Sequence, residues 1–329
     1  MNKKQKYRAI FFLIILSLIL FILNLFTGSA GIPFLNEKIL PNALWTTIMV
    51  EIRLPRAVSA FLCGGALALS GLLLQTFFRN PLAGPDILGI ASGAGFGAAF
   101  VILTLPFLGI AGMLSTAAAA VAGAVSVTLF LVILVKKSGS ITLTLITGLL
   151  TGYFINSVTG IMIRISSNQA VRSFINWSSG SFKNISIDTL FFLLPIVGFS
   201  FLAAVIISKH CDLYLLGEDY AESMGLNLKS FRYSVIIITS VLTGAVTSLC
   251  GPVAFIGIAS PHFCKFFLKT DNHNILIPGT FFSGAILALA ADIISSLPGQ
   301  GTALPLNSVT AIIGTPIVIK VLLKGYYDK

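Results

Sequence analysis

The strongest constraint on the fold of this chain is a succession of ten apolar runs, most of them long enough to cross a lipid bilayer as a helix. They cover approximately residues 9–26, 57–78, 87–105, 112–135, 141–163, 187–208, 231–250, 253–268, 275–296 and 304–323. Hydrophobic residues make up 56% of the 329 residues and charged residues only 10%, whereas soluble domains carry about 25% charged residues. The pattern predicts an all-α membrane protein, a polytopic bundle of ten transmembrane helices that forms one domain over residues 1–329.

Two details of this reading depend on small residues and prolines. The stretch from 87 to 135 is too long for one span, and Pro106, Gly109 and Gly112 mark the turn that divides it. At the N-terminus, residues 28–30 (Gly-Ser-Ala) resemble a signal-peptide cleavage site. The apolar run before them is long for a signal peptide. We therefore expect a first transmembrane helix there, with a cleaved signal peptide as the alternative.

The net charge of +10 reflects membrane topology, because the basic residues lie in small groups at the ends of the apolar runs and form no basic stripe for nucleic acid. With ten spans and a cytoplasmic N-terminus, 15 basic residues lie inside: Lys3, Lys4, Lys6, Arg8, Arg79, Lys136, Lys137, Lys209, Lys229, Arg232, Lys265, Lys269, Lys320, Lys324 and Lys329. The six outside are Lys38, Arg53, Arg56, Arg164, Arg172 and Lys183. Both termini and the polar segment 215–232 are thus predicted to be cytoplasmic.

That polar segment, LLGEDYAESMGLNLKSFR, separates two apolar runs. Ala221, Met224 and Leu228 recur at helical spacing, the acidic residues fall on the other side, and Gly225 interrupts the pattern. It predicts two short helices joined at Gly225, a cytoplasmic elbow on which a soluble partner could dock. A solvated loop between spans is the alternative.

Two other features bear on packing at the membrane surfaces. Residues 166–186 place Val171, Phe174, Ile175 and Phe182 at a spacing that suits a short helix on the outer membrane surface. Small residues recur within two spans, which favours close helix packing in lipid. They are Gly64, Gly65, Ala68 and Gly71 in one span, and Gly89, Gly93 and Gly97 in the other.

Several functional classes find no support in the residues. The sequence contains no HExxH, GxSxG or paired carboxylates, and its four cysteines have no CxxC spacing. His262 is interpreted as structural. Ionisable residues are almost absent from the middle of the spans, where a secondary transporter carries them. Without a Gly-Lys dipeptide the chain has no Walker A phosphate loop, so any ATP hydrolysis would belong to a separate partner.

The following motifs together resemble the FecCD family of permease subunits: RLPR at 53–56, GGALALSGLLLQ at 64–75, RNPLAGPDILGIASGAG at 79–95, LGE at 216–218, GPVAFIGIASPH at 251–262 and LPLNSVTAIIGTPIVIKVLL at 304–323. The resemblance covers nearly all of the chain after about residue 50. It implies an ABC type II importer permease that takes up iron siderophores, haem or cobalamin. It also implies a homodimer, two ABC ATPase subunits that bind ATP and Mg, and a periplasmic or lipid-anchored substrate-binding protein, in the bacterial cytoplasmic (inner) membrane. No cofactor or metal is expected on this chain itself.

The resemblance also implies roles for particular residues, which fall into three groups. The ATPase-coupling group is Gly217, Glu218, Ala221, Met224, Gly225 and Leu226. The group that docks the binding protein is Arg53 and Arg56, for which membrane-interface anchoring is the alternative. The cytoplasmic gate comprises Asn80, Leu82, Ser140 and Thr142. The expected cargo is a ferric siderophore, with haem or cobalamin as alternatives; a secondary transporter or membrane scaffold without an ATPase is the remote alternative.

The chain departs from the family pattern at one corner. Ser295 and Ser296 stand where some relatives carry a further outer arginine, and Ala303 stands where they carry a glutamate. The insert Pro-Gly-Gln-Gly at 298–301 is also atypical. These departures put the docking contacts at this corner in doubt.

Overall fold

A computed structural model describes residues 3–27, 46–104, 113–138, 140–183, 185–297 and 304–327. Several features predicted above lie outside these ranges: the cleavage site at 28–30, Lys38, the turn at 106–112, the insert at 298–301, Ala303 and Lys329. Within the described ranges all regular secondary structure is helical.

Within the residues that the structure describes, ten apolar helices match the ten predicted spans. Seven are long enough to cross a membrane: α1 (Lys3–Phe26), α3 (Leu54–Phe78) together with the π-helical turn η1 (Ile48–Arg53), α5 (Met113–Ser138), α6 (Ile141–Ile165), α8 (Ile187–Ile206), α11 (Leu228–Cys250) and α13 (His273–Ser296). The other three are α4 (Ile90–Thr104) and α12 (Ile256–Leu268), which are shorter, and α14 (Leu306–Tyr327), whose apolar part is described over Leu306–Lys320. The predicted all-α polytopic bundle is confirmed. The second span begins earlier than expected, because η1 continues directly into α3.

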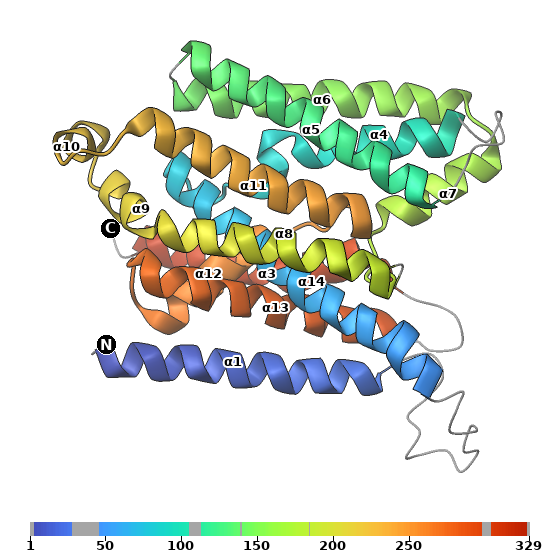
Figure 1. The fold of residues 1–329 in the computed structure, drawn as a ribbon, viewed down its shortest axis with the longest axis horizontal. Coiled ribbons are helices and arrows are strands. Elements are labelled where there is room, and N and C mark those ends of the chain that lie inside the picture. The colour runs from blue at the N-terminus through green and yellow to red at the C-terminus, as the bar shows by residue number, and fades with distance from the viewer. Residues whose placement is uncertain are drawn as a thin grey trace.

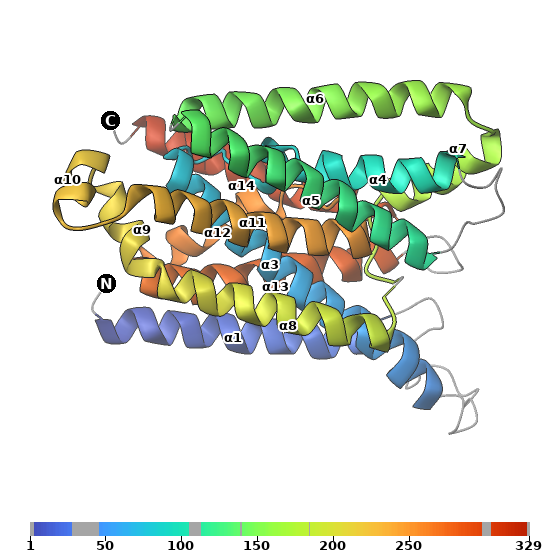
Figure 2. The same ribbon diagram turned by 45° about the horizontal axis from the view of Figure 1, so that its top comes forward.

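The helices run roughly side by side, so the bundle has two ends (Figures 1 and 2). One end, called the elbow end below, holds the start of α1, the end of α14, and the short helices α9 (Ser208–Leu215) and α10 (Glu218–Ser223). The opposite end holds α7 (Asn168–Ser178). This placement agrees with an even number of spans.

Burial separates central helices from peripheral ones. In the most apolar window of η1 and α3, 83% of the residues are buried, against 17% in α1 and in α6. Both views place α1 and α6 at opposite edges of the bundle (Figures 1 and 2). The long helices α3, α11 and α13 thus form the core, whereas α1 and α6 expose apolar side chains as a membrane-facing helix does.

The small residues singled out in the sequence lie where helix backbones touch. A Cβ on Gly64 would clash with the backbone of Gly284 in α13, and one on Gly71 would clash with the backbone of Gly257 in α12. Gly97 meets the backbone of Ala119 in α5 in the same way. The predicted packing role is therefore confirmed, since only a hydrogen fits at these crossings.

The helix predicted for the outer membrane surface exists as α7, but its apolar side is covered by protein. Ala170 and Phe174 are buried in a cluster with Ala99 and Leu103 of α4. Ile175 stays exposed. The spacing predicted the helix correctly; the expectation that its apolar face lies on lipid was wrong for Phe174, because periodicity identifies an apolar face and not what covers it.

Candidate functional site

The polar segment 215–232 forms a helical elbow at one end of the bundle. After α9, Gly217 takes a φ of 124° and opens α10, and Gly225, with a φ of 88°, turns the chain back. The Asn227 side chain then caps α11 by accepting a hydrogen bond from the backbone of Ser230. The predicted break at Gly225 is present, but the chain continues into the long helix α11 instead of a second short helix.

A buried tyrosine holds the elbow to the bundle. Tyr214 of α9 is fully buried, and its hydroxyl lies 3.1 Å from the carbonyl oxygen of Phe77 and 3.0 Å from Oε1 of Glu218. Burial, and then the nearby Glu218 carboxylate, raise the pKa of Tyr214, so it stays a protonated donor. Arg79, at the end of α3, donates to the Tyr214 carbonyl oxygen at 2.7 Å and lies 4.7 Å over its ring.

Glu218 joins the two helices that flank the turn. Its carboxylate accepts two hydrogen bonds from the Arg232 guanidinium of α11, at 3.1 and 3.0 Å. The acid at the first turn of α10 also complements the positive end of that helix. Glu218 therefore shapes the elbow from within, and it is only partly available to a partner.

The proposed coupling residues divide into buried and exposed ones. Ala221 is fully buried and Leu226 is 7% exposed, so neither offers its side chain to a partner in this structure. Met224 is 58% exposed, and Gly225 is exposed as well. The expectation that Ala221 and Met224 share one face of a helix was wrong, because α10 ends at Ser223, before Met224.

The elbow also exposes three large side chains. Leu216, Tyr220 and Met224 are 64%, 51% and 58% exposed; Leu216 precedes α10, Tyr220 lies on it and Met224 follows it. Leu216 and Tyr220 were not singled out in the sequence. Exposed apolar side chains outside the spans are typical of a surface that another protein covers.

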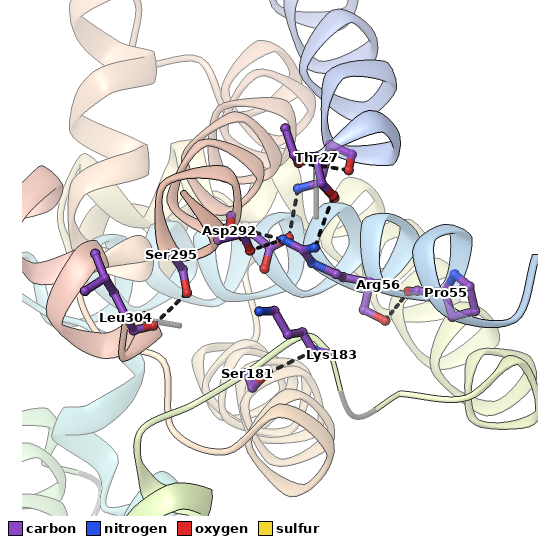
Figure 3. Close-up of polar contacts among 11 residues, drawn as sticks. Thr27, Pro55, Arg56, Ser181, Lys183, Asp292, Ser295 and Leu304 are labelled. Carbon is purple, nitrogen blue, oxygen red and sulfur yellow. Dashed lines mark hydrogen bonds and ion pairs between the residues drawn. The ribbon is translucent and has the colours of Figure 1, made fainter. Parts of the chain in front are cut away.

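The opposite end contains a buried ion pair. Arg56 Nε of α3 donates to Asp292 Oδ2 of α13 at 2.7 Å, and both side chains are less than 10% exposed (Figure 3). The same guanidinium donates to the Asp292 carbonyl oxygen at 3.1 Å and to Ser296 Oγ. Asn24 of α1 donates to Asp292 Oδ2 at 2.8 Å. Three helices, α1, α3 and α13, meet at this pair.

Both arginines predicted to dock a binding protein also hold the end of α1. Arg53 donates to the carbonyl oxygens of Leu25 and Phe26 at 3.1 and 3.3 Å, and Arg56 donates to that of Thr27 at 3.4 Å. Cations are stabilising where the last carbonyls of a helix lack partners. Arg53 and Arg56 are 4% and 5% exposed. Both side chains are buried in this structure, and their role in docking a binding protein stays a prediction. The sequence could not reveal that Arg56 pairs with a residue 236 positions away.

A polar cavity of about 210 Å³ opens beside this pair, lined by Asn176, Ser179, Gly180, Ser181, Lys183, Asp292, Ser295, Leu304, Pro305 and Leu306. Lys183 is exposed and extends towards the pair (Figure 3). Partial burial and the Arg56 charge lower the pKa of Lys183, and the Asp292 charge partly offsets this shift. With Arg56 and Lys183 facing one carboxylate, the cluster carries an excess positive charge.

Comparison with known proteins gives the chain a family. A family model described as the FecCD transport family matches residues 13–324. The chain belongs to the FecCD transport family. Similar curated proteins include vitamin B12 import system permease proteins BtuC from two Salmonella strains. The protein from Salmonella paratyphi A (strain ATCC 9150 / SARB42) is 30% identical to this chain, and the protein from Salmonella newport (strain SL254) is 31% identical. Each alignment covers 98% of this chain and 98% of the relative.

A solved structure shares the fold of this FecCD chain. It is described as an inward-facing conformation of a protein assigned to the metal-chelate type of ABC transporter. It covers 96% of this chain and 99% of its own, with a TM-score of 0.86 at 24% identity. The arrangement of the described helices is therefore a known transporter fold. The FecCD family match, the curated permease relatives and the apolar helices make the chain a multi-pass membrane permease.

The gate residues predicted from the FecCD resemblance fall on two segments. Asn80 Oδ1 accepts from the backbone of Leu82 at 2.9 Å in the loop after α3, and Leu82 is exposed. Ser140 caps α6, and Thr142 lies in the first turn of that helix, where both are exposed. The short helix η2 (Pro85–Leu88), which follows Leu82, packs against Gly148 of α6. The two segments thus approach each other through η2.

The departures from the FecCD pattern also have a place in the structure. Ser296 accepts a hydrogen bond from Arg56 and donates to the Asp292 carbonyl oxygen at 3.0 Å. Ser295 donates to the carbonyl oxygen of Leu304 at 2.6 Å. Ser296 thus completes the surroundings of Arg56, and Ser295 fixes the start of the segment that leads to α14.

Proposed function

We propose that this chain is the permease subunit of an ATP-driven importer whose cargo is cobalamin. The elbow carries the first part of the proposal. It presents the exposed side chains of Leu216, Tyr220 and Met224 outside the spans, and the ion pair of Glu218 with Arg232 fixes the shape of the elbow. An apolar surface on a rigid support suits docking to a soluble ATPase, which would hold ATP and Mg.

The cargo follows from the relatives. The curated permeases, 30–31% identical over nearly the whole chain, are named for vitamin B12 import. That supports cobalamin over a ferric siderophore, which the sequence motifs alone had favoured, and over haem. In this proposal two copies of the chain form a homodimer in the bacterial cytoplasmic membrane, with both termini and the elbow in the cytoplasm. Asn80, Leu82, Ser140 and Thr142 then narrow the cytoplasmic end of the pathway.

The assembly takes cargo from a substrate-binding protein at the opposite end of the bundle. Arg53 and Arg56 are committed to α1 and Asp292, so Lys183 is the better candidate for contact with acidic side chains of that protein. Its exposure and the excess positive charge around it favour such a contact. Arg53 and Arg56 support this surface from beneath.

Transport in liposomes tests the proposal. The chain, with its ATPase and binding protein, is expected to accumulate labelled cobalamin only when ATP is present. Ferric siderophores and haem, tested in parallel, are expected to remain outside. Accumulation of a siderophore in place of cobalamin would correct the cargo, and uptake without ATP would favour a secondary transporter.

The docking surface has its own test. Met224→Asp places a charge at an exposed apolar position of the elbow and is expected to abolish ATPase binding without unfolding the permease, because Met224 is exposed. Asp219→Asn changes an exposed acidic residue of α10 in the same elbow, so it is the matched control and should bind normally. Equal binding by both variants would remove Met224 from the proposed interface.

A further inference from the structure

A buried chain of hydrogen bonds ties the elbow to the core of the bundle. His273, the first residue of α13, is fully buried. Its Nδ1 lies 2.6 Å from Asp212 Oδ1 on α9, and its Nε2 lies 2.8 Å from Thr76 Oγ1 on α3. The backbone N–H of His273 donates to the same Asp212 oxygen at 2.9 Å. One imidazole ring therefore joins three helices.

Both ring nitrogens of His273 lie within hydrogen-bond distance of a partner, Nδ1 of Asp212 Oδ1 and Nε2 of the Thr76 hydroxyl. The Thr76 hydroxyl has one proton and also lies 2.9 Å from the carbonyl oxygen of Leu72. Both ring nitrogens are engaged, which leaves the ring little freedom to rotate.

A second bond strengthens the same junction. The hydroxyl of Ser208, the first residue of α9, lies 2.6 Å from Oδ1 of Asn274 on α13 and 2.6 Å from the carbonyl oxygen of Val205. The Asp212 side chain is 31% exposed, whereas that of His273 is not exposed at all. The junction thus begins at the protein surface beside the elbow and ends inside the bundle, at the last turns of α3.

We propose that His273 is a positioning residue for coupling: through Asp212 and Thr76 it carries a displacement of the elbow to α13 and α3. This inference rests on the proposed function, since it assigns the route by which ATPase docking reaches the spans. The contacts form a continuous route from the elbow to the core. At one end α9 leads directly into α10. At the other end α3 and α13 are core helices whose backbones touch at Gly64 and Gly284. A movement of α9 that preserves these bonds must move both core helices.

Isosteric variants test the route. Thr76→Val removes the hydroxyl that bonds His273 Nε2 and keeps the volume, whereas Thr76→Ser retains the hydroxyl. We measure cobalamin taken up per ATP hydrolysed in liposomes. Thr76→Val and Asp212→Asn are expected to lower this ratio about tenfold, within the range of allosteric couplings, and to leave ATP hydrolysis running. Thr76→Ser is expected to restore the wild-type ratio.

His210→Gln is the matched control, because His210 is an exposed histidine on the same helix, two residues before Asp212. It should behave as wild type. Asp212→Asn is a conservative, partly exposed change, which keeps the test informative if Thr76→Val does not fold. A wild-type ratio in folded Thr76→Val or Asp212→Asn would overturn the inference. Absence of ATP-driven uptake by the wild type would instead reject the proposed function. The junction could then still be tested by hydrogen exchange of the α10 amides, which we expect to be faster in Asp212→Asn than in the wild type.

Discussion

The two ends of the bundle use the same chemistry in different surroundings. At the end of the bundle away from the elbow, the Arg56 and Asp292 side chains are 6% and 3% exposed, and they join three long helices. At the elbow, the Arg232 and Glu218 side chains are 12% and 32% exposed, and they hold a helix of six residues. A buried pair cannot lose one member without a large penalty, whereas a partly exposed pair is screened by water. The first fixes the fold and the second shapes a surface.

The largest effect is expected from breaking the buried pair. Arg56→Met leaves Asp292 buried without its cation and should destabilise the permease by about 3–5 kcal/mol. Thermal unfolding of the purified protein in detergent measures this loss. Arg56→Met combined with Asp292→Leu should recover most of it, since no charge is then left buried. Arg172→Met, which removes an exposed arginine of α7, is the control. Equal stability of the single and double variants would show that the pair is not coupled.

A smaller effect is expected at the turn of the elbow. Gly225 has a φ of 88° and open space around the position of a Cβ, so backbone strain and not a clash decides the outcome. Gly225→Val should cost about 1–2 kcal/mol of local stability, and Gly225→Asn less, because asparagine tolerates positive φ better. Hydrogen exchange of the α10 amides reports this local opening. Identical exchange in the two variants would mean that the turn does not require its positive φ.

A still smaller effect is expected from the partly exposed pair. Glu218→Gln should cost about 0.2–1 kcal/mol, because water screens this pair. A double-mutant cycle with Arg232→Gln, followed by unfolding in detergent, isolates the interaction. A coupling above roughly 2 kcal/mol would place this pair in the same class as Arg56 and Asp292 and remove the contrast between the two ends.

The smallest effect concerns pH at the opposite end. Because burial and Arg56 lower the pKa of Lys183 below the ordinary 10.5, Lys183 loses its charge at a lower pH than a free lysine does. Docking of an acidic partner should therefore weaken as the pH rises, beginning below 10.5. Lys183→Arg should flatten this dependence, since arginine stays charged. Binding of the substrate-binding protein at stepped pH measures it, and a flat wild-type profile would exclude Lys183 from the contact.

Hydropathy predicted the ten helices because burial in lipid demands long apolar segments that bond their own backbone. The position of the elbow was also predictable, since a polar segment cannot lie in lipid. Pairing between distant residues was not predictable, because nothing in the local sequence of Asp292 indicates Arg56 or Asn24 as its partner. The faces of α10 were misjudged for a related reason. A six-residue helix carries too little periodicity to show which side packs on Tyr214.

The glycine crossings limit the kind of motion open to this permease. Where Gly64 meets Gly284 and Gly71 meets Gly257, each backbone fits against a position without a side chain. Sliding one helix along the other by a residue would bring a side chain into that contact, whereas a small rotation about it keeps the glycines opposed. The crossings therefore permit rotation of one helix against another and oppose sliding along it. We expect α3 to change its angle to α12 and α13 by rotating about the glycine contacts.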